Sequence, residues 1–305
     1  MPGLGHRAVT EVILPPVTSA RPQRIVPSVE HASRTALGAA LHRAAHQLLD
    51  QPPVFLDPLA LRIVGAQAER ALRSGEDPHA GSAGLRAFVA VRSRFAEDCL
   101  AEAFSRGVRQ YVLLGAGLDT LAYRSTLPGL RVYEVDHPAT QAWKRDRLAE
   151  AGIAVPPSVA YAPVDFDRET AAAPLARAGF DAAAPAVLAW LGVTPYLTRD
   201  VVLRTLAFAA GQAPGSELVL DYLESPGPGD GAERQAREAL ARRVAAAGEP
   251  FRSAFDPAEL AGTLRELGFS AVEDLGAGAL DARYLRGRGD GLRLRGRGHL
   301  LRARR

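Results

Sequence analysis

The sequence contains few of the residues that form disulfides and metal sites. Cys99 is the only cysteine among 305 residues, which excludes an intramolecular disulfide and any zinc or iron–sulfur site held by several cysteines. The seven histidines show no H-E-x-x-H spacing. His42 and His46 lie on one helical face, but we identify no acid beside them that would complete a metal site. We therefore predict no bound metal, a buried Cys99 in a helix, and both histidines at the surface.

Long hydrophobic runs are also absent. No stretch approaches the roughly 18 to 20 apolar residues of a membrane span. Residues 1–30 carry charges and five prolines but no apolar core of a secretory signal, and we interpret them as a flexible arm. With 47% hydrophobic and 23% charged residues, the chain can bury a full core. These features predict a soluble, cytoplasmic protein.

Positive charge is concentrated near the end of the chain, although the net charge is only +3. Nine arginines lie between Arg283 and Arg305, where Asp290 is the only acid. Such a cluster can bind nucleic acid. However, apolar and basic residues alternate around glycine-rich turns, which is typical of a solvated β-hairpin, and the interleaved aromatics of a base-stacking surface are missing. We favour the hairpin, expect neither nucleic acid nor a membrane as partner, and leave the oligomeric state open.

The first third of the chain is predicted to be helical. Apolar residues follow helical spacing over residues 34–50, a short helix starts from the Asp57–Pro58 pair, and a long amphipathic helix covers residues 85–107. Residues 67–84, with Gly, Ser, His and Pro, are predicted to be a loop. We expect residues 31–108 to form a helical cover, or lid, over a second domain at 109–305.

From residue 109 the pattern changes to short apolar runs separated by helical segments, which predicts an α/β fold with a parallel sheet covered on both faces. We expect a Rossmann-like, seven-stranded, mostly parallel sheet with a terminal antiparallel hairpin strand. Its ligand should lie at the carboxyl ends of the central strands. The predicted strands are 110–115, 131–136, 159–165, 186–192, 216–222, 270–276 and 299–304, and the predicted helices are 137–152, 198–212, 229–249 and 256–268.

The first predicted strand ends in Gly115-Ala116-Gly117. Two glycines let the backbone turn tightly and leave no side chain between it and a bound nucleoside. The dinucleotide fingerprint requires a third glycine at the position of Thr120. This departure argues against NAD.

Acidic residues follow each of the first three predicted strands, at Asp119, Glu134 and Asp165. Glu134 can accept hydrogen bonds from both ribose hydroxyls, and Asp165 can accept from the adenine amine while Phe166 covers the ring. Three acids fit a nucleoside with a cationic tail better than a pyrophosphate, and they predict S-adenosylmethionine as the cofactor. Three further acids are interpreted as helix caps or surface charges: Asp136, Asp167 and Asp181.

The runs "FVAVRSRFAEDCLAEAFSRGVRQYVLLGAGLDTLAYR", "VYEVDHPATQAWKRDRL", "PVDFD" and "WLGVTPYLT" resemble the leucine carboxyl methyltransferase family, including its bacterial polyketide carboxyl methyltransferase-like branch. The resemblance spans about residues 33–304 and implies a class I S-adenosylmethionine-dependent O-methyltransferase. It also implies that Arg92 pairs with the methionine carboxylate. The expected cofactor-binding set is Arg92, Gly115, Ala116, Gly117, Asp119, Thr120, Glu134, Val135, Asp165, Phe166 and Leu191.

The sequence departs from that family after the fourth predicted strand. The family usually has Glu-Gly-Val there, with the glutamate contributing to the cofactor site, whereas this chain has Leu191-Gly192-Val193. We interpret Leu191 as a variant of one branch of the family. The departure leaves the identity of the methyl acceptor open.

Methyl transfer from a sulfonium is an in-line displacement that depends mainly on positioning. A carboxylate acceptor needs no general base, whereas a phenol or alcohol benefits from one. The sequence shows no clear base after the fourth strand, which favours a carboxylate or acidic hydroxyl of a small molecule such as a polyketide. Tyr196 is the first candidate to face the acceptor and Tyr222 a weaker one, while Arg34 is interpreted as a surface residue.

Two alternative functions remain. Nucleobase and amine N-methyltransferases place Asn/Asp-Pro-Pro-Tyr after the fourth strand, but here the turn reads Thr194-Pro195-Tyr196 and lacks both the amide or acid and the second proline. A non-catalytic protein that binds the cofactor or its product is the second alternative. Its only support is Leu191, and the intact Gly-x-Gly turn argues against it.

Overall fold

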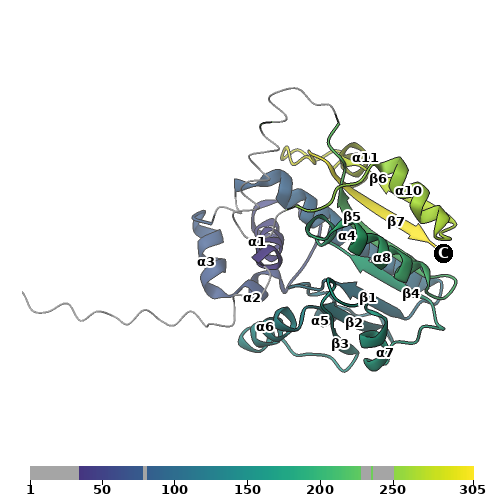
Figure 1. Ribbon diagram of the computed structural model, residues 1–305. Helices are drawn as coiled ribbons and strands as arrows, with labels where there is room; N and C mark the ends of the chain where they lie inside the picture. Colours follow the sequence, from purple (N-terminus) through teal and green to yellow (C-terminus); the bar gives the residue numbers. More distant parts are fainter. Residues whose placement is uncertain (1–33, 78–80, 228–234, 236–250) are drawn as a thin grey trace, which may run out of the picture.

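The computed structural model describes residues 34–77, 81–227, 235 and 251–305. A twisted sheet forms its centre, with helices on both faces and a further group of helices beside it (Figure 1). The predicted arm at 1–30 lies outside the described residues, as does the predicted helix at 229–249 apart from residue 235.

The sheet has seven strands, as predicted, in the order β3-β2-β1-β4-β5-β7-β6. The first five strands are parallel, whereas β7 runs antiparallel to both β5 and β6. Since the strand order reverses between β1 and β4, a crevice is expected at their carboxyl ends. The strands are β1 (Gln110–Leu114), β2 (Arg131–Asp136), β3 (Val159–Pro163), β4 (Ala186–Trp190), β5 (Glu217–Leu223), β6 (Ala271–Leu275) and β7 (Gly298–Arg304).

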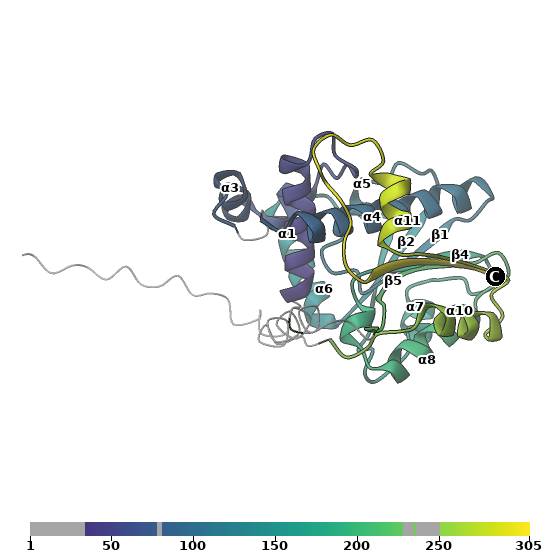
Figure 2. The same ribbon diagram turned by 90° about the horizontal axis from the view of Figure 1, so that it is seen from above.

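Helices cover both faces of the sheet (Figure 2). On one face lie α4 (Ala83–Ser105) and α11 (Ala277–Tyr284), and on the other lie α7 (Ala172–Arg177), α8 (Arg199–Ala210) and α10 (Pro257–Glu266). Phe95 of α4 packs in the same apolar cluster as Tyr111 of β1. On the other face, the fully buried Trp190 of β4 packs with Leu206 and Leu264. The strands β1 and β4 are therefore buried on both sides, which explains their continuous apolar sequence.

A third apolar cluster joins the N-terminal helices to α6 (Pro138–Glu150), which follows β2, while the short α5 (Leu121–Arg124) follows the β1 turn. The N-terminal helices are α1 (Arg34–Leu49), α2 (Ala60–Val64) and α3 (Ala66–Ser74). Helix α4 packs against both α1 and the sheet. The predicted domain boundary at residue 108 therefore follows a helix that is shared with the sheet core, and it stays a prediction.

The prediction of a loop over residues 67–84 was wrong for its first half, because Ala66–Ser74 forms α3. This segment is rich in helix-forming Ala, Arg, Leu and Glu, and it buries Leu72. Gly75 ends the helix with a left-handed conformation at φ 76°. The Gly, Ser, His and Pro residues that suggested a loop lie mainly after this point.

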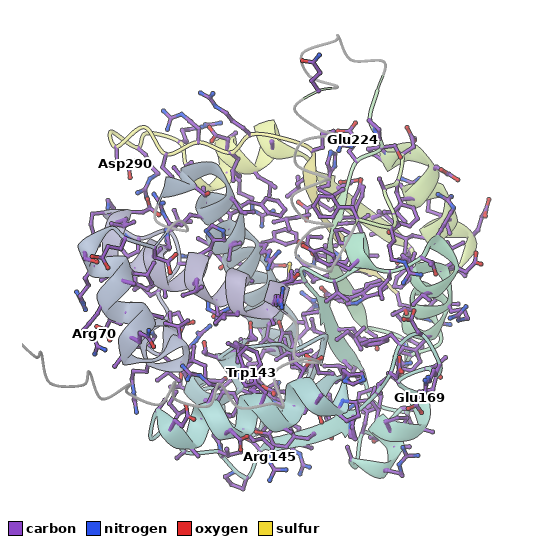
Figure 3. All side chains as sticks on the ribbon, turned by 60° about the vertical axis from the view of Figure 1, so that its left-hand side comes forward. Arg70, Trp143, Arg145, Glu169, Glu224 and Asp290 are labelled. Atoms are coloured by element: carbon purple, nitrogen blue, oxygen red, sulfur yellow. The ribbon has the colours of Figure 1, made fainter. Side chains whose placement is uncertain are left out.

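The predicted hairpin over the last 22 residues was also wrong. Strand β7 pairs with β5 and β6, and the described residues 285–297 form no strand. The alternating leucines pack instead onto the α4 face of the sheet: Leu285, Leu292 and Leu294. Arginines of this segment pair with acids, as in the contacts of Arg288 with Asp290 and of Arg293 with Asp281. Asp290 is exposed at the molecular surface, as are Arg70 and Arg145 at other places on it (Figure 3).

Both histidines of α1 were predicted at the surface, and this was wrong: His46 is 0% and His42 6% exposed. The acid that the sequence interpretation missed is Asp50, whose Oδ2 lies 2.7 Å from His46 Nδ1. The Val54 N–H donates to His46 Nε2 at 2.9 Å, so Nε2 is an acceptor and Nδ1 carries the proton. His46 therefore joins α1 to the following turn through both of its ring nitrogens.

Cys99 is buried in α4, as predicted. Burial raises the pKa of its thiol to about 12, so the reactive thiolate is not formed at neutral pH. Within the described ranges, no group of three or more His, Cys, Asp or Glu side chains is arranged to hold a metal ion. The helices of the described part of the chain include none that is long and apolar enough to cross a membrane.

Candidate active site

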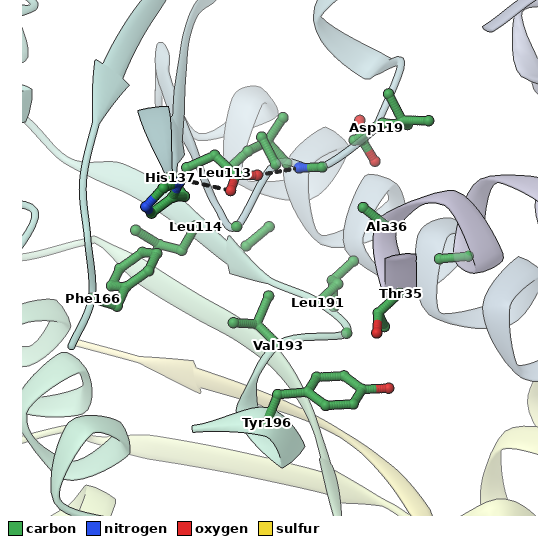
Figure 4. Close-up of a pocket in the computed structure, with 18 of the residues that line it drawn as sticks. Thr35, Ala36, Leu113, Leu114, Asp119, His137, Phe166, Leu191, Val193 and Tyr196 are labelled. Atoms are coloured by element: carbon green, nitrogen blue, oxygen red, sulfur yellow. Dashed lines mark hydrogen bonds between the residues drawn. The ribbon is translucent and has the colours of Figure 1, made fainter. Parts of the chain in front are cut away.

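A cavity of about 390 Å³ opens at the carboxyl ends of β1 and β4, between the sheet and α1. This is where the reversal of strand order predicted a ligand. Its wall contains residues from the ends of four strands, from α1 and α4, and from the segment after β5. Figure 4 places His137 and Phe166 on one side of the cavity and Thr35, Leu191 and Tyr196 on the other.

The turn after β1 forms the floor of the cavity. Gly115 and Gly117 have φ values of 70° and 45°, which side chains rarely allow. The Val135 carbonyl accepts from the N–H groups of Gly115 and Ala116 at 2.7 and 3.1 Å. A Cβ on Gly115 would lie 2.4 Å from Val193 Cγ2, and one on Gly117 3.0 Å from Ala36 Cβ. The glycines thus let α1 and the segment after β4 close onto the turn, and Val135 shapes the turn from β2.

The carboxylate that reaches the cavity from β2 is Asp136, which the sequence analysis had interpreted as a cap or surface charge. Its Oδ2 accepts from the Gly117 N–H at 2.6 Å and its Oδ1 from the His137 N–H at 2.7 Å. Burial raises the pKa of Asp136 above its usual range. A carboxylate at this position can accept hydrogen bonds from a ligand hydroxyl.

Glu134, predicted to hold a ribose, lies outside the cavity wall. It is fully buried, and its Oε1 accepts from Lys144 Nζ of α6 at 2.7 Å. Glu134 lies within β2, two residues before the strand ends, so its side chain packs against α6 instead of reaching the turn. In this structure Glu134 joins β2 to α6.

The segment after β3 contributes Asp165 and Phe166, the two residues expected to bind the adenine, to the cavity wall, and also Asp167, which had been interpreted as a surface charge. Asp165 Oδ1 accepts from the Asp167 N–H at 3.1 Å, and Arg168 Nε lies 3.3 Å from Oδ2. Phe166 is half-buried. A ring and a carboxylate thus lie side by side in the chain at this end of the cavity.

Arg92 of α4 lies in the wall on the other side, and its side chain is 14% exposed. Its Nη1 donates to Asp221 Oδ2 of β5 at 3.0 Å. Gly192 has φ 72°, and a Cβ there would lie 2.7 Å from Arg92 Nη2. The guanidinium therefore lies against the backbone of Gly192. Leu191, a member of the expected cofactor-binding set, is in the wall beside it.

Helix α1 is fixed to the turn by a buried network around Asp57. Asp57 Oδ2 accepts from Arg43 Nε and from the Thr120 hydroxyl, both at 2.7 Å, and Arg43 Nη2 also donates to the Leu118 carbonyl at 2.5 Å. Burial raises the pKa of Asp57, but the charges of Arg43 and Arg124 outweigh this and hold it below its usual range. Thr120 is thus buried behind the turn and lies outside the cavity wall.

Asp119, expected to bind the cofactor, lies in the wall, and its Oδ1 accepts from the Leu121 N–H at 2.8 Å. It therefore shapes the start of α5 while its carboxylate stays at the cavity. Arg34, at the first residue of α1, is exposed and lies outside the wall.

The aromatic group on the side opposite Phe166 is Tyr196, in the short 3-10 helix η3 (Thr194–Tyr196). Its ring centroid lies 5.6 Å from that of Phe251. Arg252 follows in the wall: its N–H donates to the Pro195 carbonyl at 2.6 Å, and its Nη1 lies 3.9 Å from Asp167.

Tyr222, the second predicted acceptor-facing residue, lies outside the cavity wall. It is 1% exposed, and its hydroxyl donates to Asp274 Oδ2 at 2.5 Å. Tyr222 precedes the end of β5, where it packs against β6 and β7, so the structure places it in the core of the sheet edge.

Sequence reasoning missed several groups at or beside the wall: Arg43, Asp136, Gly192, Asp221 and Arg252. Asp136 and Gly192 could have been identified from the sequence, because each lies at the end of a predicted strand, where a ligand is expected. Arg43 and Asp221 are contained in a helix and a strand, and no local pattern distinguishes them. The assembled cavity has Phe166 on one side, with Asp165 beside it in the chain, and Tyr196 on the other, while Asp119 lies near Ala36 of α1 (Figure 4).

The leucine carboxyl methyltransferase family matches this chain over residues 36–210. The Bacillus subtilis protein named "Putative S-adenosyl-L-methionine-dependent methyltransferase YktD" is 29% identical over 86% of this chain and 94% of its own length. A protein of Mycolicibacterium gilvum, named "Putative S-adenosyl-L-methionine-dependent methyltransferase", is 37% identical over 67% of this chain and 69% of its own.

Two solved structures have a similar fold. A "putative methyltransferase" from Thermobifida fusca matches with a TM-score of 0.54 and 21% identity, over 92% of this chain and 97% of that one. A DUF574 family protein from Streptomyces avermitilis matches with a TM-score of 0.53 and 18% identity, over 91% and 99%. The likeness covers both the sheet and the N-terminal helices and concerns the fold alone.

Proposed function

Because this chain belongs to the leucine carboxyl methyltransferase family, we propose that it transfers the methyl group of S-adenosyl-L-methionine to an oxygen atom of a small-molecule acceptor. The observation that carries the proposal is the division of the cavity, which has His137 and Phe166 on one side and Leu191 and Tyr196 on the other (Figure 4). Asp136 and Asp165 in the wall are the chain neighbours of the first pair, and Arg92 lies against Gly192, the chain neighbour of Leu191. This arrangement matches a ligand that has a nucleoside at one end and an amino acid at the other.

The donors and acceptors in the wall fit that cofactor. Asp136 has a carboxylate for the ribose hydroxyls, and Asp165 with Phe166 offers an acceptor and a ring for the adenine. Arg92 can pair with the amino-acid carboxylate. The φ values of Gly115 and Gly117 keep the floor free of side chains beneath the ligand. Thr120 and Glu134 would act from behind the wall, through the turn and α6.

The bound cofactor supplies an electrophilic methyl group on a sulfonium sulfur. The contribution of the protein is to hold the acceptor oxygen in line with it and to exclude water. Leu191, Val193 and Leu197 give the wall between the two ends an apolar surface. An acceptor would approach beside Tyr196, where Arg252 favours a negatively charged group. We therefore propose a carboxylate as the preferred acceptor, which needs no general base.

The test is a methyl-transfer assay with labelled S-adenosylmethionine and a panel of small carboxylic acids, phenols and amines. A carboxyl methyl ester releases methanol in mild alkali, whereas methyl ethers and methylamines do not. We expect alkali-labile label with at least one carboxylic acid. Alkali-stable label on phenols alone would show that the acceptor is a hydroxyl group and not a carboxylate. Label on amines alone would overturn the proposal of O-methylation. Calorimetric binding of S-adenosylmethionine without transfer to any acceptor would favour a cofactor-binding protein.

A further inference from the structure

One buried carboxylate joins three parts of the cavity wall. Asp221 lies on β5 and is 4% exposed. Its Oδ2 accepts from Arg92 Nη1 at 3.0 Å, its Oδ1 accepts from the Gly192 N–H at 2.5 Å, and its carbonyl accepts from the Thr194 hydroxyl at 2.7 Å. Asp221 thus connects α4, the segment after β4 and η3.

The contacts of Arg92 limit where its guanidinium can lie. Asp221 holds Nη1 on one side, and on another side the group lies against the backbone of Gly192, where a Cβ would be 2.7 Å from Nη2 and 2.9 Å from Nη1. A guanidinium has five N–H donors in a planar fork, and the bond to Asp221 occupies only Nη1. The arginine can therefore keep its bond to Asp221 while other donors reach a ligand in the cavity.

Charge gives Asp221 a second role. Arg92 is 14% exposed beside apolar Leu191 and Val193, where an unpaired cation is costly. Paired with Asp221, the guanidinium can stay at the cavity before a ligand arrives, so less side-chain entropy is lost on binding. Removing the carboxylate would leave the arginine free to turn toward solvent.

We propose that Asp221 is the positioning residue that holds Arg92 for the amino-acid carboxylate of the cofactor. The inference rests on the proposed function, since it requires S-adenosylmethionine or its product in this cavity. It differs from a purely structural role in one respect: loss of Asp221 should weaken only ligands that carry the amino-acid portion.

The experiment is calorimetric titration of wild type and Asp221→Asn with two ligands. S-adenosylhomocysteine carries the amino-acid portion, whereas 5′-methylthioadenosine has the same nucleoside and sulfur without it. Asparagine keeps an acceptor for the Gly192 N–H and removes the charge. We expect S-adenosylhomocysteine to bind roughly tenfold more weakly, or about 1.4 kcal/mol, and methylthioadenosine to stay within about twofold of wild type.

A double-mutant cycle tests whether Asp221 acts through Arg92. Arg92→Lys should show the same selective loss, and the double variant should bind S-adenosylhomocysteine no more weakly than Arg92→Lys alone, because coupled residues are not additive. Glu217→Gln is the matched control: this buried carboxylate lies on the same strand but pairs with Arg302 at 2.7 Å. It should leave both affinities unchanged. Asp221→Ser is the second variant if Asp221→Asn does not fold.

The outcomes separate the two proposals. If wild type binds neither ligand, the proposed function and this inference both fail. If wild type binds both ligands but Asp221→Asn weakens them equally, or weakens neither, the inference fails and the proposed function stands. Additive losses in the double variant would also overturn it, because Asp221 would then act independently of Arg92.

Discussion

The two ends of the cavity are built in different ways. The end with Asp136, Asp165 and Phe166 is formed by residues at or just after the ends of the neighbouring parallel strands β2 and β3, and their positions are fixed by the sheet. The opposite end combines α1 and η3, which are far apart in the sequence. Arg252 lies between the two ends, because its N–H donates to the Pro195 carbonyl while its Nη1 lies 3.9 Å from Asp167. The first end can stay constant while the second changes, because substitutions in α1 or after β5 leave the strand ends in place. This difference suits a common nucleoside at the first end and a variable acceptor at the second, beside the amino-acid portion of the cofactor.

The largest expected effect is at the strand-built end. Asp136→Ala removes the acceptor of the Gly117 N–H and a carboxylate in the wall. The ribose would lose two hydrogen bonds to a charged group, each contributing about 1.5 kcal/mol. We therefore expect S-adenosylhomocysteine to bind on the order of a hundredfold more weakly. Calorimetry measures this. Glu134→Gln is the matched control, since it pairs with Lys144 outside the wall: it should lower stability and leave affinity unchanged. Weaker binding in Glu134→Gln with unchanged binding in Asp136→Ala would show instead that Glu134 holds the ribose.

The second prediction concerns the anchoring of α1. Burial raises the pKa of Asp50, but hydrogen bonds from Arg86 and His46 outweigh this and hold it at about 2, below the ordinary 3.8. A carboxyl whose pKa is lowered on folding contributes stability above the unfolded value and loses it as pH falls toward the folded one. Asp50→Asn should therefore lower the free energy of unfolding by about 2 kcal/mol at pH 7, and the difference from wild type should shrink between pH 3.8 and 2.

Urea denaturation at several pH values measures this difference. Glu69→Gln, which removes an exposed ion pair with Arg73 on α3, should change stability by less than about 0.5 kcal/mol. An effect of Asp50→Asn that does not change with pH would show that the charge of Asp50 is not what holds α1.

The third prediction returns to the strand-built end. Asp165→Ala removes the carboxylate beside Phe166, and we expect roughly tenfold weaker binding of S-adenosylmethionine, about 1.4 kcal/mol, with no binding of NAD in either form. Asp181→Ala is the control, because the Asp181 carboxylate accepts from a local N–H, that of Ala183, and lies outside the wall. Equal affinities of wild type and Asp165→Ala for S-adenosylmethionine would show that Asp165 does not bind the adenine.

The smallest effects are expected at the acceptor end. Arg252→Ala should raise the KM for a carboxylate acceptor about fivefold, since one partly exposed charge contributes on the order of 1 kcal/mol. Tyr196→Phe should raise it less. Neither should alter the affinity for S-adenosylhomocysteine, because these two residues are assigned to the acceptor whereas Arg92 is assigned to the cofactor. Arg286→Ala, an exposed change outside the wall, serves as control. A loss of cofactor affinity in Arg252→Ala would show that the ends are not independent.

The sheet was predictable because its signals are local. Each strand is a short apolar run with its own boundaries, and Gly115 and Gly117 mark the turn beside the ligand. Strand-end position also pointed to Asp165 and Phe166. It did not distinguish Glu134, which pairs with Lys144 of α6, from Asp136, which ends β2 in the cavity wall.

Other parts depend on contacts between distant segments. Tyr222 was predicted to face the acceptor because it lies near the end of a strand. It is covered by β7 and β6, and the local sequence around Tyr222 does not indicate that β7 pairs with β5 and β6. Arg252 reaches the wall because its N–H donates to the Pro195 carbonyl. The arginines near the end of the chain suggested a basic hairpin, whereas their partners, such as Asp281, lie in other elements.

Trp190 gives the molecule a built-in optical reporter. The chain has only two tryptophans, and the other, Trp143, lies on α6. Trp190 is fully buried and immediately precedes Leu191 of the cavity wall. In a Trp143→Phe variant, all indole emission would come from this one ring. Ligand entry that shifts the segment after β4 could then be followed in real time by stopped-flow fluorescence, without attaching a dye.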